Sequence, residues 1–190
     1  MKRKGLLIIG ITGMLGHILF HFAKEQGAFE VYGTQRKKSE SNGIFFLDLK
    51  NFETINSLIE KIKPDVVINC AALLKSKINN REDTLKVNSV APRVIASACD
   101  QIGAKLIQIS TDSVFSGDRG NYHETDVPYP QDFYSVTKLL GEVTCAPHLT
   151  IRTSIIGREL GTKNGLLEWF LSQNGEVNGY NQAYFSVVTT

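Results

Sequence analysis

A short apolar segment followed by three evenly spaced glycines constrains the fold of this chain more than any other feature. The run from Gly5 to Ile9 has the continuous apolar character of a strand buried on both faces. Gly10, Gly13 and Gly16 follow it, and HILFHFAKEQG then carries apolar side chains at helical spacing. Strand, glycine turn and helix in this order are the context of a dinucleotide-binding fingerprint. We expect Gly10 to allow the tight turn, Gly13 to let the backbone approach a pyrophosphate, and Gly16 to let helix and strand pack closely.

Two other interpretations of this N-terminal stretch remain open. The basic residues before the apolar run suggest a secretory signal, but His17 and His21 follow that run and no A-x-A cleavage pattern does. The glycines could also form a turn with a purely structural role.

The rest of the chain alternates between strand and helix patterns. Strands are expected at residues 5–9, 30–33, 44–47, 65–69, 105–110 and 149–153, and helices after Gly16 and at 51–62, 82–102 and 132–144. This alternation predicts the α/β class, with a doubly wound parallel sheet of the Rossmann type. Ligands of such sheets bind outside the carboxyl ends of the strands, so the residues that follow each strand are the candidate site.

Charge and cysteine content narrow the choice of partners. With 21 basic and 19 acidic side chains mixed along 190 residues, the net charge of +2 indicates no face for nucleic acid or for an acidic membrane. No apolar stretch is long enough to span a bilayer. Cys70, Cys99 and Cys145 are far apart, which favours buried thiols in a reducing, cytoplasmic compartment over disulfides or a metal site.

The residues after the second and third predicted strands bear on the choice of cofactor. Arg36 stands where an acidic residue would bind the ribose hydroxyls of NAD, and an arginine there can hold the extra phosphate of NADP. A solvated basic loop is the alternative. Asp48 could accept a hydrogen bond from the adenine amino group, or else Asp48 or Asn51 could cap the next helix.

A tyrosine and a lysine share one face of the helix expected at residues 132–144. Tyr134 and Lys138 are four residues apart, and a neighbouring ammonium would lower the pKa of the phenol toward a useful range. Ser110 and Thr111 open a hydroxyl-rich turn at the end of a buried strand, where a hydroxyl could hold a substrate carbonyl. The alternatives are an amphipathic surface helix, and hydroxyls that only satisfy backbone groups at the strand end.

Six segments together resemble the extended, sugar-nucleotide-modifying branch of the short-chain dehydrogenase/reductase superfamily, and within it the dTDP-4-dehydrorhamnose reductases. They are GITGMLG, DVVINCAA, LKVNSVAP, ISTDSVFSG, YHETDVPYPQDFYSVTKLLGE and IRTSIIG. The resemblance implies that Thr111 binds the keto oxygen, that Tyr134 donates a proton, and that Lys138 lowers the tyrosine pKa and holds the nicotinamide ribose. It also makes Asp112 a substrate-side residue and Asn88 a support for the lysine. Because the position after Thr111 and Asp112 is Ser113 rather than glutamate, dehydration is not expected.

The same resemblance gives the predicted cofactor site, for NADP with NAD as the possible alternative. Its residues are Gly10, Thr12, Gly13, Met14, Leu15, Gly16, Arg36, Asp48, Leu49, Asn69, Ala71, Ala72, Tyr134 and Lys138. No metal site is predicted. Lys75, Lys77 and Arg152 could meet a substrate phosphate, although a plain surface role is equally compatible with the sequence.

The family plan also predicts how the chain is divided. Residues 1–155 are expected to form the NAD(P)-binding Rossmann domain, and 156–190 to begin a substrate-binding domain that is mostly absent, so that the chain is a fragment. A helix at 165–171 would then expose apolar surface.

The predicted function is NADP-dependent reduction of a 4-keto-6-deoxy sugar nucleotide, in deoxysugar and surface polysaccharide biosynthesis. A sugar nucleotide is the expected partner, and a homodimer is a candidate assembly. Two rivals remain: an NAD-dependent sugar-nucleotide epimerase, and a non-catalytic, cofactor-binding regulatory subunit, since the regulatory subunit of methionine adenosyltransferase has this reductase-like fold.

Overall fold

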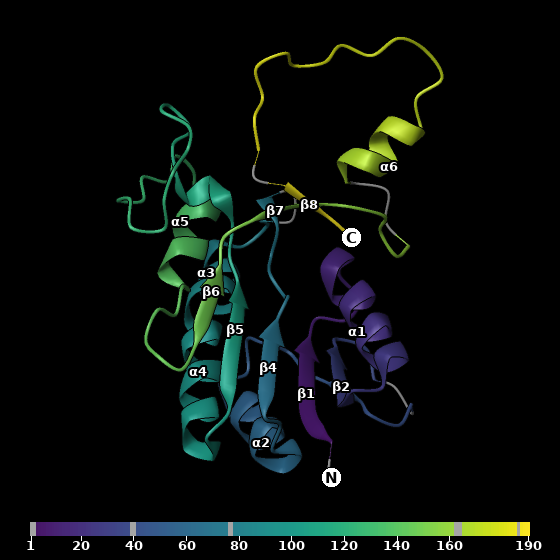
Figure 1. Cartoon of the computed structure of the whole chain (residues 1–190), viewed down its shortest axis with the longest axis vertical. Helices are drawn as coiled ribbons and strands as arrows, with labels where there is room; N and C mark the ends of the chain where they lie inside the picture. Colours follow the sequence, from purple (N-terminus) through teal and green to yellow (C-terminus); the bar gives the residue numbers. More distant parts are fainter. Residues whose placement is uncertain (1–2, 39–40, 76–77, 162–164, 186) are drawn as a thin grey trace.

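A six-stranded parallel sheet forms the centre of the molecule, in the order β3-β2-β1-β4-β5-β6 (Figure 1). The computed structural model describes residues 3–38, 41–75, 78–161, 165–185 and 187–190. The strands are β1 (Lys4–Ile9), β2 (Phe29–Gln35), β3 (Ile44–Phe46), β4 (Val66–Asn69), β5 (Lys105–Ile109) and β6 (Leu149–Ile151). Because the strand order reverses direction on either side of β1, the sheet is doubly wound, and the predicted fold class is confirmed.

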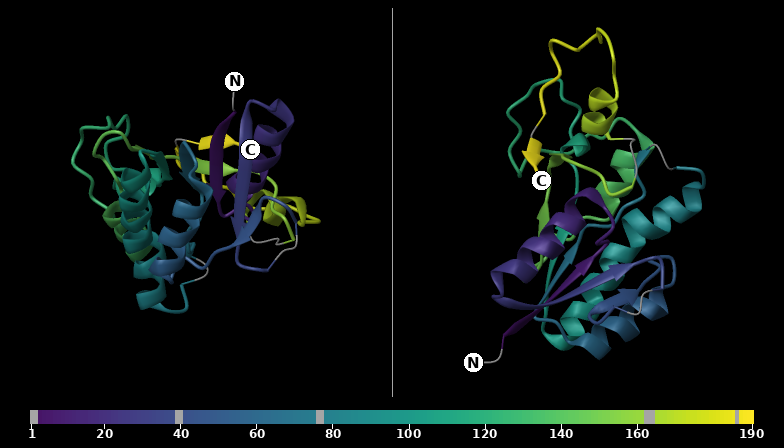
Figure 2. Two further views of the ribbon diagram at one scale, coloured as in Figure 1. Left: turned by 90° about the horizontal axis from the view of Figure 1, so that it is seen from below. Right: turned by 90° about the vertical axis from the view of Figure 1, so that its right-hand side faces the viewer.

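Helices pack on both faces of this sheet. The α-helices in the described residues are α1 (Met14–Gln26), α2 (Phe52–Ile62), α3 (Arg81–Leu85), α4 (Ala91–Ile102), α5 (Phe133–Leu140) and α6 (Leu166–Leu171), of which α6 lies away from the sheet. Helices α2 and α4 cover one face, where Leu7, Val67 and Leu106 of the sheet pack with Ile55 and Ile95 in the larger core. Helix α1 lies on the opposite face, in a smaller core (Figure 2).

The strand register brings the candidate site together. Ile9 of β1 lies beside Thr34 of β2 and Asn69 of β4, and Asn69 lies beside Gln108 of β5. The glycine turn after β1 and the loops after the neighbouring strands therefore meet at one edge of the sheet. This edge includes the position between β1 and β4 where the winding direction changes, which is where ligands of such sheets bind.

The helix predicted at 82–102 is interrupted by a π-turn, η2 (Lys86–Val90), between α3 and α4. Pro92 has no N–H to donate to the carbonyl of Asn88, so regular α-helical bonding cannot continue through this point. The backbone of Gly141 packs against that carbonyl instead, and a Cβ atom on Gly141 would lie 1.9 Å from the Asn88 oxygen. The local irregularity thus allows α5 to approach closely.

Helix α5 is shorter than the predicted 132–144 segment, because Gly141 forms its C-cap. Cys145 lies in the turn before β6 and is exposed, so the expectation of a buried thiol was wrong there. Cys99 is buried and Cys70 is half-buried, and all three are free thiols. Within the described ranges, no helix has the length and apolar character required to cross a bilayer.

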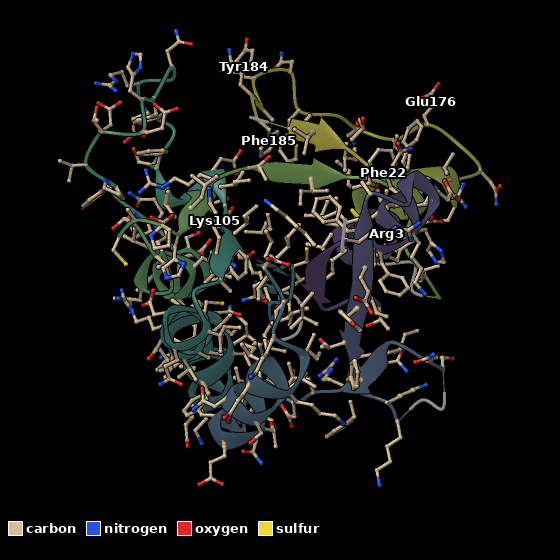
Figure 3. The ribbon with its side chains drawn as sticks, turned by 60° about the horizontal axis from the view of Figure 1, so that its bottom comes forward. Arg3, Phe22, Lys105, Glu176, Tyr184 and Phe185 are labelled. Carbon is tan, nitrogen blue, oxygen red and sulfur yellow. The ribbon has the colours of Figure 1, made fainter. Side chains whose placement is uncertain are left out.

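The C-terminal segment extends away from the sheet (Figure 1). Its short strands β7 (Ser154–Ile156) and β8 (Val187–Thr189) pair in parallel, which the sequence analysis did not anticipate. Helix α6 was expected, as was its apolar exposure: Trp169, Phe170 and Leu171 are 44%, 56% and 56% exposed. Further exposed aromatic side chains, Tyr184 and Phe185, follow in the same segment (Figure 3).

Candidate functional site

A cavity of about 480 Å³ lies at the carboxyl edge of the sheet. This volume is in the usual range for a small-molecule or cofactor site. Of the predicted site residues, those that line it are Gly10, Thr12, Gly13, Met14, Leu15, Arg36, Asp48, Leu49, Ala71, Ala72 and Thr111. Gly16, Asn69, Asp112, Tyr134 and Lys138 are not part of its wall.

The glycine turn has the geometry expected of a phosphate-binding turn. Gly10 has φ +88°, a conformation that favours glycine, and a Cβ atom there would lie 3.0 Å from Ala71. A Cβ atom on Gly16 would lie 2.2 Å from the carbonyl oxygen of Gly10, so close packing excludes a side chain. Gly13 is the N-cap of the 13-residue helix α1, and it lines the cavity. A helix N-terminus preceded by bare backbone fits an anionic group such as a pyrophosphate.

The second and third strands supply another part of the cavity wall. Arg36 is exposed there, and the Asp48 carboxylate accepts a hydrogen bond from the Lys50 amide at 3.0 Å. Asn51, not Asp48, is the N-cap of α2, which leaves Asp48 at the cavity. Lys50 also forms an ion pair of 3.1 Å with Asp83, and both residues line the cavity, although the sequence analysis named neither.

Asn69 and Asn88 hold the loop after β4, whose residues Ala71 and Leu73 line the cavity. The buried Asn69 side chain donates to Gln108 Oε1 at 2.8 Å and accepts from the Ala71 amide at 3.2 Å. Asn88 bonds to both backbone groups of Leu73 and donates to Thr137 Oγ1 at 3.1 Å. Asn88 thereby connects Thr137, the residue before Lys138, to the loop after β4.

The turn after β5 holds Thr111 and Asp112. Thr111 lines the cavity, and its hydroxyl accepts a hydrogen bond from the Ser113 amide at 3.2 Å, so it also caps a short 3₁₀ helix. Asp112 accepts a hydrogen bond from Ser154 Oγ at 2.6 Å. The hydroxyl of Thr111 therefore satisfies a backbone group at the strand end, which is one of the two roles that the sequence left open. The other role, binding of a substrate carbonyl, stays a prediction.

Tyr134 and Lys138 lie on α5, whose N-cap Asp132 accepts from the Ser135 amide at 2.9 Å. The Lys138 ammonium is buried and donates to the Ile109 carbonyl at 2.6 Å. Burial lowers the pKa of Lys138 to about 8, although the nearby carboxylate of Glu142 opposes this effect.

The pKa of Tyr134 departs from the sequence-based expectation. Burial, followed by the charges of Asp132 and Asp112, raises it to about 12. A pKa lowered by Lys138 was expected, and this structure shows the opposite direction. The physical reason is that the phenol is desolvated and faces two carboxylates, while the ammonium is directed at a strand carbonyl. Tyr134 therefore carries its proton throughout the physiological pH range.

The basic residues proposed to meet a substrate phosphate have other partners. Lys75 forms an exposed ion pair with Asp132, and Arg152 forms a pair with the buried carboxylate of Glu142. Lys77 lies outside the described residues. Glu142, which lies two residues beyond the end of α5, was not singled out from the sequence. Among the described residues, no cluster of His, Cys, Asp or Glu is arranged to hold a metal ion.

A doubly wound parallel sheet, a glycine turn after its first strand and a helix whose Tyr and Lys are four residues apart are the features of the short-chain dehydrogenase/reductase class of folds. The sequence model described as "RmlD substrate binding domain" matches residues 3–176. The chain belongs to this family.

The curated relatives include both a subunit of methionine adenosyltransferase and dTDP-4-dehydrorhamnose reductases. Over 138 residues the chain is 35% identical to methionine adenosyltransferase 2 subunit beta of Xenopus tropicalis, and it covers 41% of that protein. Over 159 residues it is 32% identical to dTDP-4-dehydrorhamnose reductase of Escherichia coli, and it covers 50% of that protein. These matches include 72% and 78% of this chain. The chain thus spans about half the length of the curated relatives it matches.

A solved structure supports the same assignment. The dTDP-4-dehydrorhamnose reductase of Bacillus anthracis, determined in complex with NADP, is 29% identical and superposes with a TM-score of 0.72. The match covers 83% of this chain and 56% of the other.

Proposed function

We propose that the protein is an NADP-dependent reductase of a 4-keto-6-deoxy sugar nucleotide, in deoxysugar and surface polysaccharide biosynthesis. The observation that carries the proposal is the shared edge of the sheet, where the glycine turn and Thr111 line one cavity and Lys138 of α5 bonds to the end of β5. Residues 1–155 would bind the cofactor, and residues 156–190 would begin the substrate-binding region.

The chain's own residues supply positioning and a proton. Thr111 would donate its hydroxyl hydrogen bond to the keto oxygen, and Tyr134, which holds its proton, would transfer it to that oxygen as the carbonyl becomes an alcohol. The ammonium of Lys138 would hold the nicotinamide ribose and stabilise the tyrosinate that remains. When bound, NADPH supplies the hydride that reduces the carbonyl carbon.

Preference for NADP is proposed from Arg36. Its guanidinium is exposed at the cavity wall, where charge-assisted hydrogen bonds to the additional phosphate of NADP can form. The NADP complex of the Bacillus anthracis reductase supports this choice.

Consumption of NADPH with a panel of 4-keto-6-deoxy sugar nucleotides tests the proposal, with Tyr134→Phe as the matched variant. We expect oxidation with one panel member, and a rate that depends on Tyr134. If no panel member causes NADPH oxidation while the cofactor binds, the reductase proposal fails.

A second candidate, a non-catalytic cofactor-binding subunit, is favoured by the similarity to methionine adenosyltransferase 2 subunit beta. Binding alone does not require a proton donor, so the presence of Tyr134 and Lys138 together on α5 supports the reductase instead. Cofactor binding that is unaffected by Tyr134→Phe, with no turnover of any substrate, would favour the subunit.

A further inference from the structure

A buried ion pair lies behind the proposed catalytic residues. Arg152 donates to both carboxylate oxygens of Glu142, from Nε at 2.9 Å and from Nη2 at 2.8 Å. The side chains are only 5% exposed for Glu142 and 20% exposed for Arg152. Removing both charges from water is costly, so such a pair by itself is weak evidence for a stabilising role.

The carboxylate has a third partner, and this partner connects it to the site. Ser110, the residue before Thr111, donates from its hydroxyl to Glu142 Oε1 at 2.8 Å. Lys138, one helical turn before Glu142, donates to the carbonyl of Ile109, the residue before Ser110. Lys138 of α5 and Glu142, which lies just beyond the C-cap of that helix, therefore hold two consecutive residues, Ile109 at the end of β5 and Ser110 after it. Thr111 comes directly after them.

Arg152 extends the same arrangement to the loop beyond Thr111. Its guanidinium lies 5.1 Å from the ring centre of Phe115, which stacks on Tyr122 at 4.5 Å with an angle of 9° between the rings. Arg119 covers the other ring at 5.0 Å. Cation–π contacts of this kind fix the loop relative to the end of β6.

We propose that Glu142 is a positioning residue of the site, which keeps Lys138 charged and holds Thr111 in register with α5, with Arg152 as its counter-ion rather than a ligand for substrate phosphate. The catalytic meaning of this proposal rests on the proposed reductase function. The electrostatic coupling between Glu142 and Lys138 is independent of that function.

The groups that face Lys138 determine what the loss of Glu142 would do. They are the carboxylate of Glu142, just beyond the end of α5, and the thiol of Cys70, directly after β4. Burial is the main influence and lowers the pKa of Lys138, while the Glu142 carboxylate favours the ammonium. Without this carboxylate, Lys138 would lose its proton at a lower pH.

Lysine labelled with carbon-13 at Cε provides a direct readout in the cofactor-free protein, with the Lys138 signal assigned through its loss in Lys138→Arg. We expect Glu142→Gln to shift the titration midpoint of Lys138 to lower pH by about one unit. Glu142→Asp, which keeps the charge, should restore most of the midpoint. Glu82→Gln removes a carboxylate from the exposed pair with Lys86 and serves as the control that leaves the midpoint unchanged.

Arg152→Gln provides a second variant with the opposite expectation, should Glu142→Gln fail to fold. It removes a positive charge and leaves the carboxylate to act on Lys138, so the midpoint should move to higher pH. A midpoint equal to that of Glu82→Gln in every folded variant would overturn the proposal.

Titration with NADPH separates the positioning role of Glu142 from the proposed reductase function. At pH 8 we expect Glu142→Gln to bind NADPH about fivefold more weakly than the wild type, with the difference disappearing at pH 6, where Lys138 is again charged. If the wild type binds no NADPH, the proposed function fails while the NMR result still decides the role of Glu142. If the affinity loss is equal at both pH values, Glu142 has only a structural role and the positioning proposal is refuted.

Discussion

Alanine at two of the glycines in the N-terminal turn should separate stability from cofactor binding. In Gly16→Ala, the new Cβ atom would lie 2.2 Å from the Gly10 oxygen and 2.8 Å from the Gly10 carbonyl carbon. Both atoms belong to backbone, so the helix or the turn must move. In Gly13→Ala, the nearest atom would be the Gly10 oxygen at 3.4 Å, which is ordinary contact.

The magnitudes follow from these distances. Overpacking costs about 1–3 kcal/mol, and a backbone clash of this size belongs at the upper end. The higher helix propensity of alanine returns about 1 kcal/mol. The free energy of unfolding of Gly16→Ala should therefore fall by about 2 kcal/mol, which lowers Tm by roughly 4–8 °C in a chain of this size.

Gly13→Ala should unfold close to the wild-type temperature but bind the cofactor poorly. A methyl group at the cavity wall would displace the pyrophosphate from one amide, and a hydrogen bond to a charged group is worth about 1.5–3 kcal/mol. This loss corresponds to a Kd for NADPH that is about 10–100 times higher. Thermal unfolding and fluorescence titration of the two variants measure the effects. Wild-type stability of Gly16→Ala, or wild-type affinity of Gly13→Ala, would refute this account of the turn.

Of four further predictions, three concern the site and one concerns a helix cap. Tyr134→Phe should lower the rate of NADPH oxidation about 10²–10⁴-fold while its Kd for NADPH stays close to the wild-type value, because only the proton donor is lost; a wild-type rate would exclude Tyr134 as the donor. The pKa of Lys138 is lowered to about 8, so its ammonium is present below this pH and lost above it, and NADPH affinity measured from pH 6 to 10 should fall as the pH rises through about 8. Arg36→Ala should weaken NADPH binding about tenfold or more and leave NADH binding nearly unchanged, whereas equal losses would exclude recognition of the additional phosphate. Asn51→Ala should lower the free energy of unfolding by about 1 kcal/mol in a denaturant titration, because α2 loses the side-chain acceptor for the Thr54 amide.

Local patterns were sufficient to predict the sheet, because each strand is a compact apolar run and each turn contains its own glycines or polar residues. Gly10 and Gly16 are good examples: the spacing alone predicted a tight turn and a close packing contact, and both are present in the structure. The end of α5 was not obtained in this way: Gly141 is its C-cap, and the close approach of this glycine to the distant carbonyl of Asn88 is visible only in the folded chain.

The charges of the site were harder to predict than its position. The spacing of Tyr134 and Lys138 suggested a direct interaction, but burial and the carboxylates of Asp112 and Asp132 determine the pKa of the phenol. Glu142 and Arg152 come from separate elements, and only the folded chain brings them into contact. Sequence patterns record which side chains share an element, whereas desolvation depends on everything packed around them.

Transfer of deuterium from NADPH, labelled at the transferring position, to a panel of 4-keto-6-deoxy sugar nucleotides would test the central claim most directly, with mass spectrometry of the sugar-nucleotide products. The reductase account predicts a product with one deuterium at C4, formed together with oxidised cofactor, and a sharply reduced yield with Tyr134→Phe. An isomerised sugar nucleotide without net NADPH consumption, or unchanged substrate in the presence of bound cofactor, would contradict it.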